Sequence, residues 1–102
     1  MKRAQRLDHF RDGLESSEKE HRARLAAAEA KLGEARSRLA ELQRYRDEYL
    51  QGLGNRTASG IDATALRDYH AFVARLGEAV RQQTLLLSRT VLECDFERQR
   101  WH

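Results

Sequence analysis

The feature that most constrains this chain is an apolar stripe with heptad spacing, present in two long runs on either side of one break. The first run steps by four and three residues without a slip through Leu14, Glu18, His21, Leu25, Ala28, Leu32, Ala35, Leu39, Leu42, Arg46, Tyr49 and Leu53, with Leu7 extending it backward. The second run has the same spacing, through Leu66, Tyr69, Val73, Leu76, Val80, Gln83, Leu87, Thr90, Cys94, Glu97 and Trp101. Such spacing is typical of coiled-coil helices, which bury one seam of side chains.

The break between the two runs is rich in residues that end helices. Gly52, Gly54, Asn55, Ser59 and Gly60 fall within nine residues, and the chain has no proline. Glycine and asparagine tolerate the backbone angles of turns. We therefore expect an all-α fold in which two long helices form an antiparallel coiled-coil hairpin. The single domain spans residues 1–102, with helices over about 5–51 and 61–102 and a loop over 52–60. Asp62 or Thr64 is the expected cap of the second helix.

The predicted seam is polar at the end far from the loop. There Arg11, Glu18 and His21 are expected to face Thr90 and Glu97. Polar seam residues lower stability but help to set register. This end of the hairpin is therefore predicted to fray.

Charge and cysteine content narrow the classes of function. The 102 residues carry a net charge of +3, but basic and acidic residues alternate along the chain. Nucleic-acid-binding proteins usually gather lysine and arginine on one face, so a solvated helix surface is favoured over nucleic-acid binding. The one cysteine, Cys94, cannot form a disulfide within the chain, and no apolar run is long enough to cross a membrane. A cytoplasmic location is expected.

A second apolar column lies beside the seam. On the second helix it comprises Phe72, Ala79 and Leu86, and on the first helix Tyr45 and Phe10. Such flanking positions are normally charged in a two-stranded coiled coil. Counted back from the loop, Tyr45 lies near Phe72 and Ala79, with Leu42, Tyr49 and Leu76 beneath. This predicts an aromatic patch that binds another protein, although the same rings could simply widen the core or pack against a second copy.

The residues do not form a pattern that indicates an enzyme. The four histidines do not pair at a metal-ligand spacing, Cys94 has no placed base, and the glycines of the break lack the lysine of a phosphate-binding loop. A two-helix rod also offers no concave pocket. We therefore expect no catalytic residues, no cofactor and no metal.

Residues 39–83 carry a family resemblance. It rests on LxxYRDEYLxxL at Leu42–Leu53, on Gly60–Ile61 at the end of the loop, and on LRDYHAFVARLGEAVRQQ at Leu66–Gln83. This stretch resembles the FliJ family of flagellar export proteins and its relatives in other type III secretion systems.

The resemblance implies a stalk similar to the two-helix stalk of a rotary ATPase γ subunit. It implies insertion into the ring of the export ATPase FliI, contact with the cytoplasmic domain of the export gate protein FlhA, handling of empty export chaperones, and a peripheral position at the inner membrane. By position, the gate-binding residues are Leu42, Tyr45, Tyr49, Phe72, Leu76 and Ala79, the patch that the heptad count also indicates. The ATPase contact is expected at the end of the rod that carries the chain termini. The alternative is a structural tether or oligomerisation module in which Phe72 and Leu86 pack against a second copy.

Overall fold

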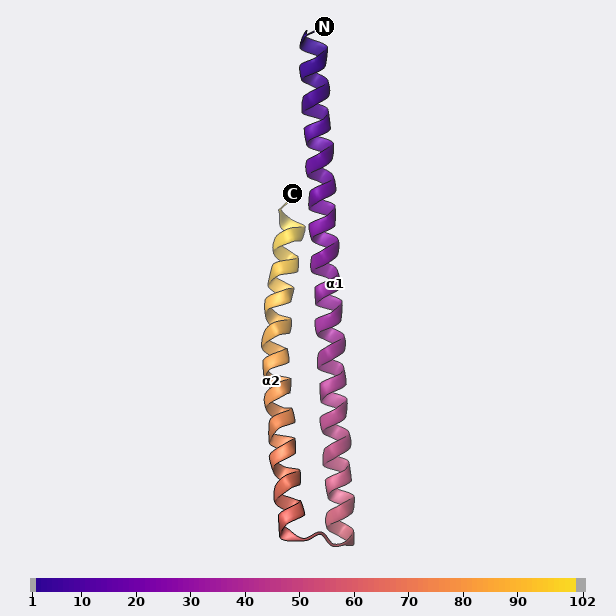
Figure 1. Ribbon diagram of the computed structural model, residues 1–102, viewed down its shortest axis with the longest axis vertical. Coiled ribbons are helices and arrows are strands. Elements are labelled where there is room, and N and C mark those ends of the chain that lie inside the picture. Colours follow the sequence, from indigo (N-terminus) through magenta and orange to yellow (C-terminus); the bar gives the residue numbers. More distant parts are fainter. Residues whose placement is uncertain (1, 101–102) are drawn as a thin grey trace.

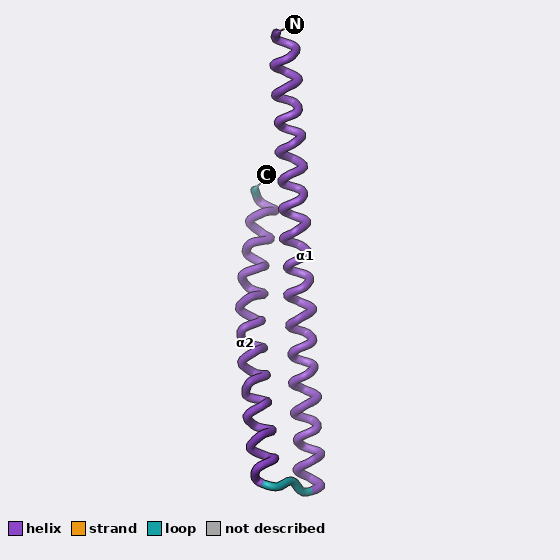
Figure 2. The backbone as a smooth tube through the Cα atoms, in the orientation of Figure 1, coloured by secondary structure: helices purple, strands orange, loops and turns teal. Residues whose placement is uncertain are grey.

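The chain folds into two long helices that lie side by side. The computed structural model describes residues 2–100, in which α1 spans Lys2–Ser59 and α2 spans Ala63–Gln99. The helices run antiparallel, joined by residues 60–62 at one end of a rod that measures 88 × 19 × 15 Å (Figures 1 and 2). The prediction of an all-α hairpin is confirmed. Trp101 and residue 102, assigned above to the second helix, lie outside the described residues.

The predicted position of the loop was wrong. The first helix does not end near residue 51 but continues through Gly52, Gly54 and Asn55 to Ser59. A glycine inside a helix costs only about 1 kcal/mol, and continuing the helix keeps Leu53 in the seam. The hydroxyls of the last turn also support it. Thr57 Oγ1 donates to the carbonyl of Leu53 at 2.7 Å, and Ser59 Oγ donates to that of Asn55 at 3.2 Å.

The turn itself is three residues long. Gly60 has a φ of 94°, in the left-handed region that favours glycine, and this ends α1. Asp62 is extended, and its Oδ1 accepts a hydrogen bond from the backbone N–H of Ala65 at 2.8 Å. Asp62, rather than Thr64, is therefore the cap of α2.

The seam between the helices follows the heptad count over the paired length. From His21 to Leu53 on α1, and from Leu66 to Glu97 on α2, every residue of the two heptad runs is buried or half-buried. The most buried apolar side chains are Leu32, Ala35, Leu76, Val80 and Cys94. The polar seam residue Gln83 is accommodated because its Nε2 donates to the carbonyl of Ala35 at 3.2 Å.

The later end of α1 changes which residues face each other. His21 lies beside Glu97 as predicted, with Nδ1 and Oε2 3.9 Å apart. Arg11 and Glu18 do not face α2, because residues 2–20 of α1 project beyond its end and are all exposed (Figure 1). The predicted pairing of these two residues with Thr90 and Glu97 was therefore wrong. α1 is 58 residues long and α2 only 37, so the first turns of α1 have no counterpart in the described part of α2.

Candidate protein-binding site

The patch near the loop is built from aromatic rings of both helices. Tyr45 and Tyr49 lie one turn apart on α1, with ring centroids 5.0 Å apart in an edge-to-face arrangement. Phe72 of α2 lies 4.5 Å from the Tyr49 ring and 6.2 Å from the Tyr45 ring. Such offset and edge-to-face pairs are favourable geometries for aromatic rings. The three rings therefore form one cluster across the seam, with Tyr45 beside Phe72 as the heptad count predicts.

The six residues of the predicted patch differ in exposure, so some form its outer surface and others the layer beneath. Tyr45 is 43% exposed, whereas Leu76 is only 8% exposed and belongs to the core. The other four are half-buried, namely Leu42, Tyr49, Phe72 and Ala79. A partner would therefore meet Tyr45 first and then the outer edges of the half-buried side chains. Leu76 and Tyr49 serve mainly to support the rings above them.

The cluster extends further towards the loop than the predicted patch does. Tyr69 lies 5.8 Å from Tyr49, and the guanidinium of Arg56 lies 5.6 Å from the Tyr69 ring centroid. Arg75 stacks in the same way on Phe72, at 5.7 Å. The prediction did not include the two arginines or Tyr69 in the patch. Tyr69 stands three residues before Phe72, and Arg75 three residues after it, so helical spacing alone could have placed Tyr69 and Arg75 beside the patch.

Hydrogen bonding with Tyr45 raises the pKa of Tyr49 above the ordinary tyrosine value of 10.0. Repulsion from a Tyr45 phenolate and partial burial act in the same direction. The Tyr49 phenol therefore stays neutral throughout the physiological pH range, and the surface it supports keeps its apolar character.

Other exposed apolar residues lie away from the cluster. On the outer face of α2, Leu85, Leu92 and Phe96 are 62%, 69% and 64% exposed. Sequence reasoning missed this stripe, although the steps of seven and four residues are helical. Phe10, predicted in the same flanking column as Tyr45, is 67% exposed on the projecting part of α1 and does not join the cluster.

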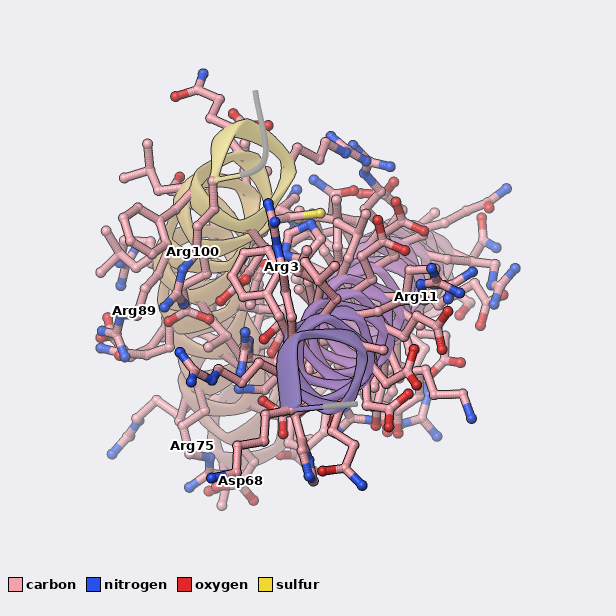
Figure 3. All side chains as sticks on the ribbon, turned by 90° about the horizontal axis from the view of Figure 1, so that it is seen from above. Arg3, Arg11, Asp68, Arg75, Arg89 and Arg100 are labelled. Atoms are coloured by element: carbon pink, nitrogen blue, oxygen red, sulfur yellow. The ribbon has the colours of Figure 1, made fainter. Side chains whose placement is uncertain are left out.

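Charges surround the rod rather than gathering on one side. Viewed along its axis, side chains ending in nitrogen and in oxygen radiate from both helices (Figure 3). Several pair across the helices, including Lys31 with Glu93 at 4.0 Å and Arg98 with Glu29 at 3.8 Å. In the described part of the chain, no cluster of His, Cys, Asp and Glu could hold a metal ion, and Cys94 is fully buried. Nor is any helix of residues 2–100 long and apolar enough to cross a membrane.

One comparison with known proteins gives a match. The model of the family described as the flagellar FliJ protein matches residues 2–102. No curated protein and no solved structure matches the chain. The family match covers both helices and the whole aromatic cluster.

Proposed function

Because the chain belongs to the flagellar FliJ protein family, it is a component of the flagellar export apparatus, and we propose that it acts there as a non-enzymatic coiled-coil stalk. The stalk couples the ring of the export ATPase FliI to the export gate protein FlhA. It also takes part in the recycling of empty export chaperones. It works in the cytoplasm, held at the inner membrane by the export apparatus.

The observation that carries the proposal is the aromatic cluster. Tyr45 is 43% exposed and rests against Tyr49 and Phe72 on a rod whose described residues include no element that covers it. Exposed aromatic side chains held in one position are the groups that contribute most to protein interfaces. Because rings from both helices form the cluster, a partner docked there would contact both helices at once. We assign this surface to the cytoplasmic domain of the gate.

The shape of the molecule supports the stalk role. The two helices pack along a continuous seam in a rod 88 Å long. The segments that carry the aromatic cluster, residues 45–49 and 69–72, lie in the half of the rod near the loop, and the projecting part of α1 lies at the opposite end (Figure 1). Two partners could therefore bind at separate places. The ATPase is assigned to the end that carries the chain termini.

The gate assignment is tested by measuring binding of the gate's cytoplasmic domain to wild type and to Tyr45→Ala. Loss of an interface aromatic of this kind typically costs about 2 kcal/mol or more, so we expect binding at least about tenfold weaker. Phe96→Ala is the matched control, because Phe96 is an aromatic residue that is 64% exposed and lies outside the cluster. It should bind the gate as wild type does.

Two results would count against the gate assignment. One is the absence of binding by helical wild-type protein, and the other is equal binding by wild type and Tyr45→Ala. The tether alternative predicts instead that the chain self-associates, and that Phe72→Ala and Leu86→Ala each abolish this self-association. Circular dichroism must show that these variants remain helical, since Phe72 also packs against Tyr49.

A further inference from the structure

Two arginines stand at the two ends of the aromatic cluster, and each is held against a ring. The guanidinium of Arg56, on α1, lies 5.6 Å from the centroid of the Tyr69 ring. The guanidinium of Arg75, on α2, lies 5.7 Å from the centroid of the Phe72 ring. The ring of Tyr49 contacts both of these rings, with centroid distances of 5.8 Å and 4.5 Å. The contacts therefore form one series that begins and ends with an arginine.

No carboxylate of the described residues neutralises either arginine. The positions three and four residues from Arg56 along α1 hold only glycine, leucine and serine. Arg75 has one acidic residue at this distance, Glu78, but both oxygens of that carboxylate are already engaged. Its Oε1 accepts a hydrogen bond from Gln82 Nε2 at 3.1 Å, and its Oε2 accepts one from Arg81 Nε at 3.0 Å. Within residues 2–100, Arg56 and Arg75 therefore form no ion pair.

A guanidinium that stacks on a ring keeps its hydrogen-bond donors available. Its flat face rests on the aromatic face, whereas its N–H groups point outward in its own plane. Both arginines are exposed, and Arg75 lies at the periphery of the rod when the molecule is viewed along its axis (Figure 3). The ring contact also restricts the long side chain, so less conformational freedom is lost on binding. These donors are suited to a carboxylate, which a guanidinium binds through two parallel hydrogen bonds.

We propose that Arg56 and Arg75 recognise carboxylates of the protein surface that docks on the aromatic cluster. This inference rests on the gate assignment proposed above, and it states the chemistry of the gate surface, which is an apolar patch bordered by acidic side chains. The rings provide contact area, and the arginines select the partner. A gate surface with basic side chains at these places would meet two unpaired positive charges, and this repulsion disfavours it.

Two acidic residues near the cluster distinguish this proposal from its opposite. Glu48 follows Tyr45 by three residues, and Asp68 precedes Tyr69 by one. Both side chains are exposed, and neither contacts a ring or forms an ion pair within the described residues. Unlike the arginines, they are not held in one position. A basic partner would depend on these two carboxylates, whereas an acidic partner depends on the two arginines.

The first experiment measures binding of the gate's cytoplasmic domain to Arg56→Gln and to Arg75→Gln. Each variant should bind about tenfold more weakly than wild type, because it loses a hydrogen-bonded pair with a charged group. The matched control is Arg81→Gln, which removes the same charge from a guanidinium that Glu78 already binds. This control and Glu48→Gln should bind as wild type does. Urea unfolding checks that every variant is folded.

A charge series at residue 75 separates recognition of a carboxylate from mere support of the Phe72 ring. Affinity for the gate domain should fall in the order wild type, Arg75→Lys, Arg75→Gln, Arg75→Glu. Binding by wild type should also weaken as salt is added, and binding by the double variant Arg56→Gln, Arg75→Gln should depend less on salt. Equal losses in the Gln and Glu variants, with an unchanged salt dependence, would show that the arginine only supports the ring and would overturn the proposal.

The remaining outcomes separate this inference from the gate assignment. If Tyr45→Ala loses binding while both arginine variants bind as wild type does, carboxylate recognition is refuted and the gate assignment stands. Weaker binding by Glu48→Gln and Asp68→Asn, without any effect of the arginine variants, would show a basic gate surface and would also refute it. Wild type that does not bind the gate domain counts against both.

Discussion

At the scale of single residues, two glycines near the loop end have different roles. Gly60 adopts a φ of 94°, which an L-residue with a Cβ reaches only with strain. Gly54 lies inside α1, and a Cβ added there would meet nothing within 4 Å. Of these two positions, only residue 60 has a backbone conformation that requires glycine. Gly54 occupies a position where another residue would be a better helix former.

Alanine at these two sites should change stability in opposite directions. Gly60→Ala should lower the free energy of unfolding by about 1–2 kcal/mol, the cost of a left-handed conformation. Gly54→Ala should raise it by roughly 0.5–1 kcal/mol through helix propensity. Urea unfolding followed by circular dichroism measures both. A change of the same sign in the two variants would contradict this assignment of the turn.

Tyr49 offers a second test at this scale, through its titration. Hydrogen bonding with Tyr45 raises the pKa of Tyr49, so Tyr45→Phe should move that pKa back towards 10.0. Because folding favours the neutral phenol, the resulting stabilisation is complete below the ordinary pKa and is lost as the pH rises through the raised one. Phenolate absorbance during alkaline titration reports the shift. Tyr69→Phe removes a tyrosine that is not a cause of the raised pKa, and serves as the control.

At the scale of elements, α1 has two parts with different support. From His21 to Leu53 its heptad residues pack against α2, whereas residues 2–20 are all exposed. Helix propensity alone holds such a segment weakly. The stability of α1 should therefore fall from its middle towards its N-terminus.

Hydrogen exchange should report this gradient directly. At concentrations where the protein is monomeric, amides in residues 2–18 should exchange rapidly, and those around Leu32 slowly. Strong protection near Glu18 in dilute protein would contradict this account of α1.

Replacing a buried leucine of the seam should lower the free energy of unfolding far more than replacing an exposed leucine outside it. Leu32 is 4% exposed, so Leu32→Ala should cost about 2–4 kcal/mol in the free energy of unfolding. Leu85 is 62% exposed, so Leu85→Ala should change stability by no more than about 0.5 kcal/mol. Denaturant unfolding of the two variants tests this. Similar losses at both sites would mean that the helices pack in another register.

At the scale of the whole molecule, the rod has two candidate binding surfaces at separate places. The segments that carry the cluster, residues 45–49 and 69–72, lie in the half of the rod near the loop, and the projecting part of α1, at the end assigned to the ATPase, lies opposite (Figure 1). A partner bound to one surface leaves the other accessible. Such an arrangement suits a stalk that connects two bodies.

Much of this architecture follows from periodicity, which is a local property. The heptad spacing by itself determined two helices and a shared seam, and a shared seam between consecutive helices determined the hairpin. The placing of Tyr45 beside Phe72 follows in the same way, because both lie next to the seam and near the break. Their role in gate binding remains a prediction.

Only the tertiary structure decided where the turn lies and which seam residues are covered. Several glycines could have ended the first helix. Each costs only about 1 kcal/mol inside a helix, however, so the helix can also continue through them. Packing of Leu53 and the cap at Asp62 outweigh that cost and leave Gly60, with its φ of 94°, as the residue that ends α1. The position of this turn sets the register, and the register leaves Leu7 and Leu14 exposed although their spacing matches that of the buried Leu32. Spacing specifies which face of a helix is apolar, but the presence of a partner for that face depends on contacts between distant residues.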